Sequence, residues 1–442
     1  TWPLNLHHHL PRYYFNYLLS GDYVRDDYRY ILEHIYVRVD GIGWMPEANQ
    51  PIFLRRAPVE STSMMCLSAA DVPPYSPSGN DSSSLRLKIV MSRNVRTAIE
   101  YAVHQSDWIQ PKPDVVPGEF MFRHPSWIHW RASPNDRQTD VVSFAKDLVA
   151  HNFKTGEIVT STWTTNMTRS RPGAVEEDYA DLTDASATFF SATGTELRKM
   201  GFRVKFAGYP LWPTNASSLF RAPIVDAATG QASPWLDFSD PEQVNAYVQQ
   251  INASLASKTI DSLLFANFEG LSGGVRVSNP TFEKYPNLLI RSYLEAVARL
   301  KLDDASTYHA YKTQHLPLWI QQWNDGMDVA AYMRALVANV LTLSIGGYSF
   351  FAANPVDSLD VAATEEQYIR WVQAVTFLPH MSFARLPWSN GRSERAVIVT
   401  QKCLQLRDKH VSALLDAAKR RISSGEPIIR PLWWAAPDDS RS

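Results

Sequence analysis

The sequence predicts an α/β fold: a (β/α)8 TIM barrel preceded by an antiparallel β-sandwich domain. Two patterns in the 442 residues favour it. Before about residue 118, strand-like runs alternate apolar and polar residues; after it, short apolar runs alternate with amphipathic helical segments. The turn from Trp127 to Gln138 also lacks the glycines that a doubly wound nucleotide-binding sheet, the rival fold, would place there.

The first part of the chain has the pattern of antiparallel strands. Residues 35–40 and 85–90 alternate apolar and polar side chains, and residues 73–84 between them are rich in Pro, Ser and Gly, as surface loops are. A proline-rich linker covers 111–118. We therefore expect a complete or incomplete sandwich domain over 1–118, a barrel over 119–437 and a short tail over 438–442.

The barrel region contains seven short apolar runs separated by amphipathic helices, which predicts seven or eight strand–helix units. The predicted strands are 127–130, 157–162, 203–208, 262–266, 318–321, 349–352 and 428–433. The predicted helices are 138–151, 186–200, 240–257, 287–300, 328–345, 365–378 and 396–424. Asp240 followed by Pro241 is typical of a helix start, with the aspartate as cap.

The composition excludes some partners and leaves others open. The net charge is −2, from 43 basic and 45 acidic residues, and no basic stripe is present, so nucleic acid is not expected to bind. The histidines show no metal-ligand spacing, so we expect no metal and no cofactor. The lysine–arginine cluster 419–421 is read as a solvated helix end. The 14 tryptophans fit either stacking on sugar rings or a large aromatic core.

Several features point to the secretory pathway, with an extracellular or luminal location. Four N-x-[Ser/Thr] triplets offer N-glycosylation sites: Asn80, Asn166, Asn215 and Asn252. Cys66 and Cys403 either pair or remain free, buried thiols. The apolar stretch 335–356 is long enough to span a bilayer, but its Gly, Asn and Pro residues favour a buried helix leading into a buried strand. We expect no membrane span in this chain; an upstream anchor stays open.

Five segments resemble glycoside hydrolase family 31, and within it the branch of the myogenesis-regulating glycosidase. They follow the family's order and lie at 123–130, 199–206, 341–350, 368–383 and 425–434. The two most specific read Tyr368-Ile-Arg-Trp-Val-Gln-Ala-Val-Thr-Phe-Leu-Pro-His-Met-Ser-Phe and Gly425-Glu-Pro-Ile-Ile-Arg-Pro-Leu-Trp-Trp. The resemblance implies the same barrel fold and retaining α-glycoside hydrolysis, which uses two carboxyl groups about 5–5.5 Å apart.

The site positions implied by this resemblance have lost their charges. The nucleophile position holds Ala266 and the acid/base position holds Ala330. An arginine position holds Gln321, and an aspartate position holds Asn354. The substrate-binding positions that remain are formed by aromatic and amide side chains: Trp163, Tyr209, Phe268, Gln321, Trp323 and Asn354.

Two functional hypotheses follow. In the first, the chain is a catalytically inactive glycoprotein that binds carbohydrate or has a structural role in a larger assembly with glycan or protein partners. In the second, it is an active retaining α-glycosidase, of α-galactosidase or α-glucosidase type, with relocated carboxylates. The first candidates for these carboxylates are Glu269, Asp328 and Asp325, followed by Glu157, Asp261 and Asp357.

Overall fold

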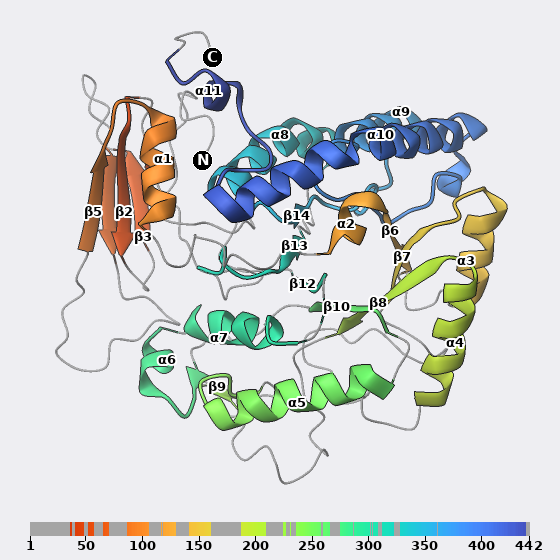
Figure 1. Cartoon of the computed structure of the whole chain (residues 1–442), viewed down its shortest axis with the longest axis horizontal. Helices are drawn as coiled ribbons and strands as arrows, with labels where there is room; N and C mark the ends of the chain where they lie inside the picture. Colours follow the sequence, from red (N-terminus) through yellow and green to blue (C-terminus); the bar gives the residue numbers. More distant parts are fainter. Residues whose placement is uncertain are drawn as a thin grey trace.

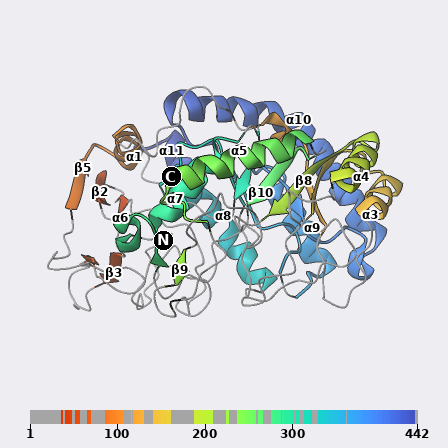
Figure 2. The same ribbon diagram turned by 90° about the horizontal axis from the view of Figure 1, so that it is seen from below.

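The computed structural model describes residues 36–37, 40–47, 52–56, 65–69, 86–105, 116, 118–129, 141–160, 187–208, 224–226, 230, 236–257, 260–265, 275–285, 287–300, 302, 304–307, 312–321, 328–359 and 361–438. Its main feature is a barrel of parallel strands surrounded by helices. Figures 1 and 2 both place a small antiparallel sheet at one end of the molecule and two barrel helices at the other.

In the described part of the chain, eight parallel strands form the barrel in the order β14-β13-β12-β10-β8-β7-β6-β15. They are β6 (Ser126–His129), β7 (Gly156–Thr160), β8 (Phe202–Gly208), β10 (Ser262–Phe265), β12 (Ser306–Thr307), β13 (Trp319–Gln321), β14 (Phe351–Ala352) and β15 (Ser382–Phe383). Two parallel bridges, from Ala352 to His380 and from Val356 to Phe383, join the first and last strands. The predicted barrel fold is therefore confirmed.

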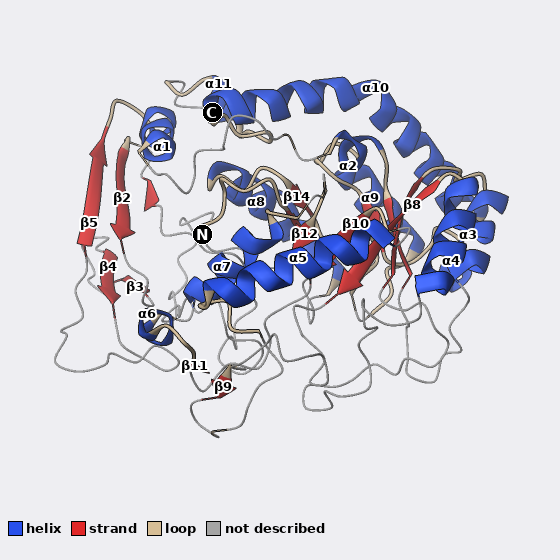
Figure 3. Cartoon of the chain, turned by 60° about the horizontal axis from the view of Figure 1, so that its bottom comes forward, coloured by secondary structure: helices blue, strands red, loops and turns tan. Residues whose placement is uncertain are grey.

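The helices around the barrel agree with those predicted from periodicity (Figure 3). They are α3 (Val141–Ala150), α4 (Ala187–Lys199), α5 (Pro241–Ser257), α7 (Asn287–Val297), α8 (Val329–Ile345), α9 (Glu365–Val375) and α10 (Glu394–Ser424). Two shorter helices, α2 (Glu119–Arg123) and α6 (Pro280–Lys284), and a two-stranded ribbon of β9 (Val225–Asp226) and β11 (Val275–Arg276) complete this region. A 3-10 turn, η1 (Ser389–Gly391), precedes α10.

Polar residues fix where these helices begin and end. The predicted cap Asp240 accepts a hydrogen bond from the Glu242 amide at 2.8 Å, just before α5. Thr364 and Gln367 form a reciprocal capping box at the start of α9. Gly425 ends α10 at a φ of 76°, a left-handed conformation that favours glycine.

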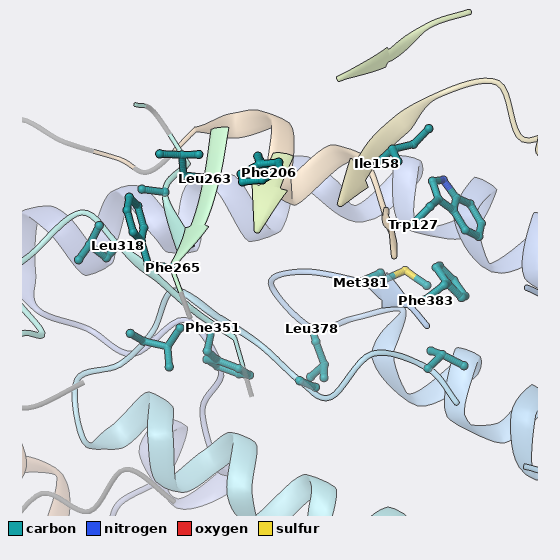
Figure 4. Packing of buried hydrophobic residues seen from close by; sticks show 14 of the residues in the cluster. Trp127, Ile158, Phe206, Leu263, Phe265, Leu318, Phe351, Leu378, Met381 and Phe383 are labelled. Carbon is teal, nitrogen blue, oxygen red and sulfur yellow. The ribbon is translucent and has the colours of Figure 1, made fainter. Parts of the chain in front are cut away.

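The outer faces of the strands and the inner faces of the helices form one large apolar core (Figure 4). Trp127 of β6 stacks on Phe383 of β15 with ring centroids 4.6 Å apart, which packs the closing strand against the first one. Phe265 of β10 meets Tyr293 of α7 edge to face at 5.9 Å. In this layer the aromatic side chains pack against one another. Of the two interpretations of the aromatic content, these residues therefore support a large aromatic core.

The antiparallel sheet before the barrel contains β1 (Tyr36–Val37), β2 (Ile42–Glu47) and β5 (Arg86–Met91), and β3 (Ile52–Arg56) pairs separately with β4 (Met65–Ala69). One face of the sheet is covered by α1 (Val95–His104). Helix α11 (Leu432–Ala435) docks on α1, where Trp434 is buried in a cluster with Met45 and Ile99. The boundaries at 118 and 437 stay predictions.

One sequence expectation is wrong, and a second holds only in part. The apolar run 428–433 forms no strand: Ile428 packs into a cluster beneath the barrel, and Pro431 precedes α11. The eighth strand is β15, whose two residues are too few to give a periodic signal. In the cluster 419–421, Lys419 and Arg420 are exposed as predicted, but Arg421 is buried and donates to the carbonyl groups of Gly347 and Gly425 at 2.8 Å.

The apolar stretch 335–356 forms the predicted helix and strand, since α8 ends at Ile345 and β14 begins at Phe351. Over the residues that the structure describes, no helix combines the length and apolar character needed to cross a membrane. Cys403 is a buried, free thiol on α10, and burial raises its pKa. Cys66 lies on β4.

Candidate functional site

The candidate site lies at the carboxyl ends of the barrel strands, which we call the mouth, because barrel enzymes carry their chemistry there. The described residues at or just beyond these ends include His129, Thr160, Thr307, Gln321 and Asn354, all of them buried. None of these five side chains is a carboxylic acid. At these five positions the mouth is therefore polar and carries no acidic side chain.

The ends of β6 and β7 carry a histidine and a threonine in contact with each other. His129 Nδ1 lies 3.3 Å from Thr160 Oγ1, and the His129 ring contacts Phe144 of α3 with centroids 5.1 Å apart. The contact with α3 places His129 in the layer between the strands and the helices. This is the satisfied core histidine that a lone histidine on a buried strand usually is.

Two amides stand where the family resemblance implies an arginine and an aspartate. The Gln321 amide nitrogen donates to the Ala353 carbonyl at 2.9 Å, and the Asn354 backbone amide donates to the Tyr332 hydroxyl at 3.1 Å. Gln321 is 7% exposed and Asn354 is 1% exposed. Gln321 therefore joins the end of β13 to the residue after β14, and the Asn354 backbone joins that segment to α8; both side chains are uncharged amides.

Asp357 is a buried carboxylate in the loop after β14, and it holds the backbone of this loop in place. Its φ is 61°, and its carboxylate accepts from the Ala363 amide at 2.6 Å. Arg392 pairs with it directly, and Arg385 does so at 3.3 Å. The Arg392 guanidinium also lies 4.2 Å from the centre of the Tyr368 ring. Asp357 is thus fully engaged as a clamp between the β14 loop and the start of α10.

Asp328 and Ala330 lie at the start of α8. Asp328 is the exposed N-cap and accepts from the Ala331 amide at 2.8 Å. Ala330, the position that the resemblance equates with the acid/base, is exposed in the first helical turn. Asp328 therefore has a structural role that explains its presence, whether or not it also serves chemistry.

Two further candidate carboxylates face away from the mouth. Asp261 accepts from the Val204 amide at 2.8 Å and pairs with Arg198 at 2.7 Å, ahead of β10. Glu157 lies near the start of β7 and pairs with Lys205 of β8 at 2.9 Å. Burial raises the pKa of Glu157, although Lys205 acts in the opposite direction. Both carboxylates serve the amino-terminal half of the barrel.

Glu157 belongs to a buried polar cluster at the amino-terminal end of the barrel, which we call the floor. The floor network consists of Ser126, Glu157, Lys205, Ser306 and His380. Lys205 of β8 reaches Ser306 of β12 at 3.1 Å although β10 lies between those strands. Contact across an intervening strand requires side chains that point into the barrel. The network therefore fills the barrel interior.

Sequence reasoning missed the floor network. Its signal is a polar residue at an inward position of otherwise apolar, buried strands, as with Lys205 in 202–208 and Glu157 in 156–160. Several predicted site residues lie outside the described residues, and their places stay predictions: Trp163, Tyr209, Ala266, Phe268, Glu269, Trp323 and Asp325. The same holds for the predicted glycosylation sites Asn80, Asn166 and Asn215. Asn252 lies on α5 and is half-buried.

Comparison with known proteins gives two homologues. The chain is 29% identical to the SITS-binding protein of Tetronarce californica over 233 residues, which covers 51% of this chain and 33% of that protein. It is 26% identical to the myogenesis-regulating glycosidase of Mus musculus over 364 residues, covering 74% and 48% respectively. The chain thus matches about a third and about half of the length of these relatives. No protein-family model matches it.

Solved structures share the fold at low sequence identity. A mutant of the protein Kfla1895 matches with a TM-score of 0.66 and 17% identity over 92% of this chain and 62% of its own. The cycloalternan-forming enzyme from Listeria monocytogenes, solved with a pentasaccharide substrate, matches with a TM-score of 0.65 and 14% identity over 93% and 44%. The ER glucosidase II complex matches with a TM-score of 0.65 and 12% identity over 92% and 47%.

These comparisons confirm the resemblance predicted from the sequence motifs. The chain is a homologue of the myogenesis-regulating glycosidase and the SITS-binding protein, and it has the barrel fold of the glycoside hydrolase family 31 enzymes.

Proposed function

We propose that this chain is a catalytically inactive relative of the family 31 glycosidases that binds carbohydrate at the mouth of its barrel. The observation that carries the proposal is the loss of charge at several separate strand ends. Gln321 and Asn354 are neutral where the family resemblance implies an arginine and an aspartate, and alanines occupy both positions implied for the catalytic carboxyls. Retaining hydrolysis needs two carboxyl groups, one as nucleophile and one as acid/base.

The described candidate carboxylates have other roles, which further supports the proposal. Asp357 is held by two arginines, Asp261 accepts a hydrogen bond from the backbone of β8, and Asp328 is the N-cap of α8. A carboxylate whose oxygens already bond to arginine side chains is not free to contact a substrate. Glu157 lies in the floor network, at the opposite end of the barrel from the mouth.

Binding does not need the lost carboxylates. A sugar is held by flat apolar faces and by hydrogen-bond donors and acceptors, and Trp163, Tyr209, Phe268 and Trp323 are the side chains we propose as faces. One of the two homologues is named for binding and the other is named a glycosidase. A glycan-binding protein in the secretory pathway, with glycans of its own at Asn80, Asn166, Asn215 or Asn252, fits both the fold and the sequence.

The proposal is tested by measuring turnover and binding on the same purified protein. Aryl α-galactoside, α-glucoside and α-xyloside are assayed from acidic to neutral pH, and binding of the corresponding free sugars and oligosaccharides is measured by calorimetry. We expect no turnover, together with saturable binding to one sugar class that Trp163→Ala weakens. Trp388→Ala is the matched control. It also removes a tryptophan, but the Trp388 ring stacks on His151 near α3 and is not one of the faces proposed to bind sugar.

The alternative is an active glycosidase with relocated carboxylates, and the same assay separates it. Turnover that Glu269→Gln, Asp325→Asn or Asp328→Asn abolishes would establish that alternative and end the proposal of inactivity. Absence of both turnover and sugar binding would instead leave a structural role in a larger assembly as the function, and would contradict the carbohydrate-binding proposal.

A further inference from the structure

The floor network contains a chain of three contacts that runs from helix α2 to a buried carboxyl group. His380 Nδ1 lies 2.7 Å from the Met121 carbonyl oxygen of α2. His380 Nε2 lies 2.9 Å from Ser126 Oγ, and Ser126 Oγ lies 3.0 Å from Glu157 Oε2. All three side chains are buried. We call His380, Ser126 and Glu157 the relay.

Counting hydrogens shows that a neutral histidine and an ionised glutamate cannot satisfy the relay. A carbonyl oxygen only accepts, so His380 Nδ1 must carry the hydrogen, and Nε2 then accepts. The single hydroxyl hydrogen of Ser126 can go to His380 or to Glu157, but not to both. The opposite histidine tautomer would place two lone pairs together at 2.7 Å, the shortest of the three contacts. One contact therefore lacks a hydrogen.

One additional proton completes every contact. With the proton on Glu157 Oε2, the carboxylic acid donates to Ser126 Oγ, Ser126 donates to His380 Nε2, and His380 Nδ1 donates to Met121. We propose that the relay takes up one proton from solvent, held on Glu157, and that this proton locks helix α2 onto the barrel floor. The relay is then a pH-sensitive element built into the fold.

The surroundings of Glu157 favour the protonated form. Its Oε1 atom is buried with no hydrogen-bond partner in the described structure, and a carboxylate with a bare buried oxygen is costly when ionised. Burial raises the pKa of Glu157, and the nearby Asp304 carboxylate raises it too, while Lys205 and Arg203 act in the opposite direction. The Lys205 ammonium group contacts Glu157 Oε2 at 2.9 Å, and it also contacts Ser306 Oγ and Met121 Sδ.

The surroundings of His380 keep the proton off the imidazole. Two cationic groups act on it, Lys205 from β8 and Arg407 from α10, and a third positive charge between them would be repelled. Burial lowers the pKa of His380 well below its usual range; the hydrogen bond to the Met121 carbonyl acts in the opposite direction, and the two cations lower the pKa further. The geometry and the charges therefore assign the shared proton to the Glu157 end.

The relay matters because it ends on the helix that closes the floor. Helix α2 is held by His380 on the Met121 carbonyl and by Arg407 Nε on the Phe122 carbonyl at 2.8 Å. The Arg203 guanidinium lies 4.5 Å from the Phe120 ring centre. Without the extra proton, a contact in the relay fails and His380 is held less firmly. We expect α2 to open more readily as the pH rises.

Infrared spectroscopy of the whole chain tests where the proton is. We expect a protonated-carboxyl band at pH 5–6 that disappears as the pH rises and that is missing in Glu157→Gln. Asp304→Asn is the matched control, since it removes the neighbouring buried carboxyl and leaves the band. If Glu157→Gln does not fold, the NMR resonances of the two His380 ring nitrogens in the native chain still test the proposal, because it requires the neutral Nδ1–H tautomer. A cationic His380, or no carboxyl band over this range, would overturn it.

Hydrogen exchange tests the lock itself. After correction for intrinsic exchange, amide protection at residues 120–124 should fall by up to about tenfold per pH unit between the ordinary pKa of an exposed glutamate and the raised pKa of the relay, since opening releases one proton in that range, and it should level off at higher pH. Ser126→Ala should abolish this pH dependence. Ser382→Ala is the control, because this buried serine pairs with Ser126 across β6 and β15 but its hydroxyl lies outside the relay. Equal pH dependence in both variants would contradict the proposal.

Discussion

The two ends of the barrel use charge in opposite ways. At the floor, Glu157 and Lys205 are ionisable groups with side chains only 1% and 2% exposed, joined at 2.9 Å. At the mouth, the corresponding buried polar groups are the amides of Gln321 and Asn354. In a barrel enzyme the mouth carries the reactive charges and the floor serves stability. In this chain the glutamate–lysine pair lies at the floor, where its position in a barrel indicates a role in stability rather than in chemistry.

The largest expected effect comes from breaking the charge pair at the floor. Lys205→Met leaves Glu157 without its cation, and we expect a loss of about 3–5 kcal/mol in the free energy of unfolding near neutral pH. The loss should be smaller at pH 5, because Glu157 can then become neutral by protonation. Urea unfolding followed by circular dichroism at the two pH values measures both effects.

The double variant Lys205→Met with Glu157→Gln is the control for this prediction. It removes both charges, and we expect it to regain about half of the lost stability or more, since neutral replacements of a buried pair cost far less than one orphaned charge. A double variant as unstable as the single one would mean that Lys205 acts through its contacts with Ser306 and Met121 rather than through its charge.

A smaller effect is expected near the mouth, at the Asp357 clamp. Asp357→Asn keeps the left-handed backbone accessible but leaves Arg392 buried without its anion, so we expect a loss of about 2–3 kcal/mol. The folded fraction of this variant should bind sugar as tightly as the native chain does. Calorimetry below the melting temperature measures this binding. Glu366→Gln, in an exposed pair with Arg370, should change stability little. Loss of binding without loss of stability would make Asp357 a ligand group instead.

The comparison also separates what the sequence could and could not predict. Helices such as α5 and α9 were predicted to within a few residues, because several turns of apolar periodicity and a polar cap act together. Strands β12 and β15 have two residues each, so their pairing depends on neighbouring strands rather than on a local pattern. The run 428–433 is as apolar as a strand, but only Ile428 is buried, in the cluster beneath the barrel, and Leu432 is exposed; which of these residues is buried depends on tertiary packing.

The candidate site follows the same division. The family resemblance located Gln321 and Asn354, which the structure places at the end of β13 and just after β14. The floor network could not be predicted, because Ser126, Lys205 and His380 come together only through strand register and barrel closure. A polar residue within a buried strand signals that a partner exists, but it does not identify the partner or the end of the barrel where they meet.

The smallest expected effect separates a helix cap from a catalytic acid at Asp328. As the N-cap of α8, it accepts a hydrogen bond that Ala cannot replace, so Asp328→Ala should cost about 1 kcal/mol, whereas Asp328→Asn retains an accepting oxygen and should cost little. A catalytic acid would show the reverse pattern: Asn would abolish turnover of an aryl α-glycoside while leaving stability intact. Thermal unfolding and turnover measured on both variants therefore decide whether the Asp328 carboxylate caps helix α8 or acts as a catalytic acid, and we expect that it caps the helix.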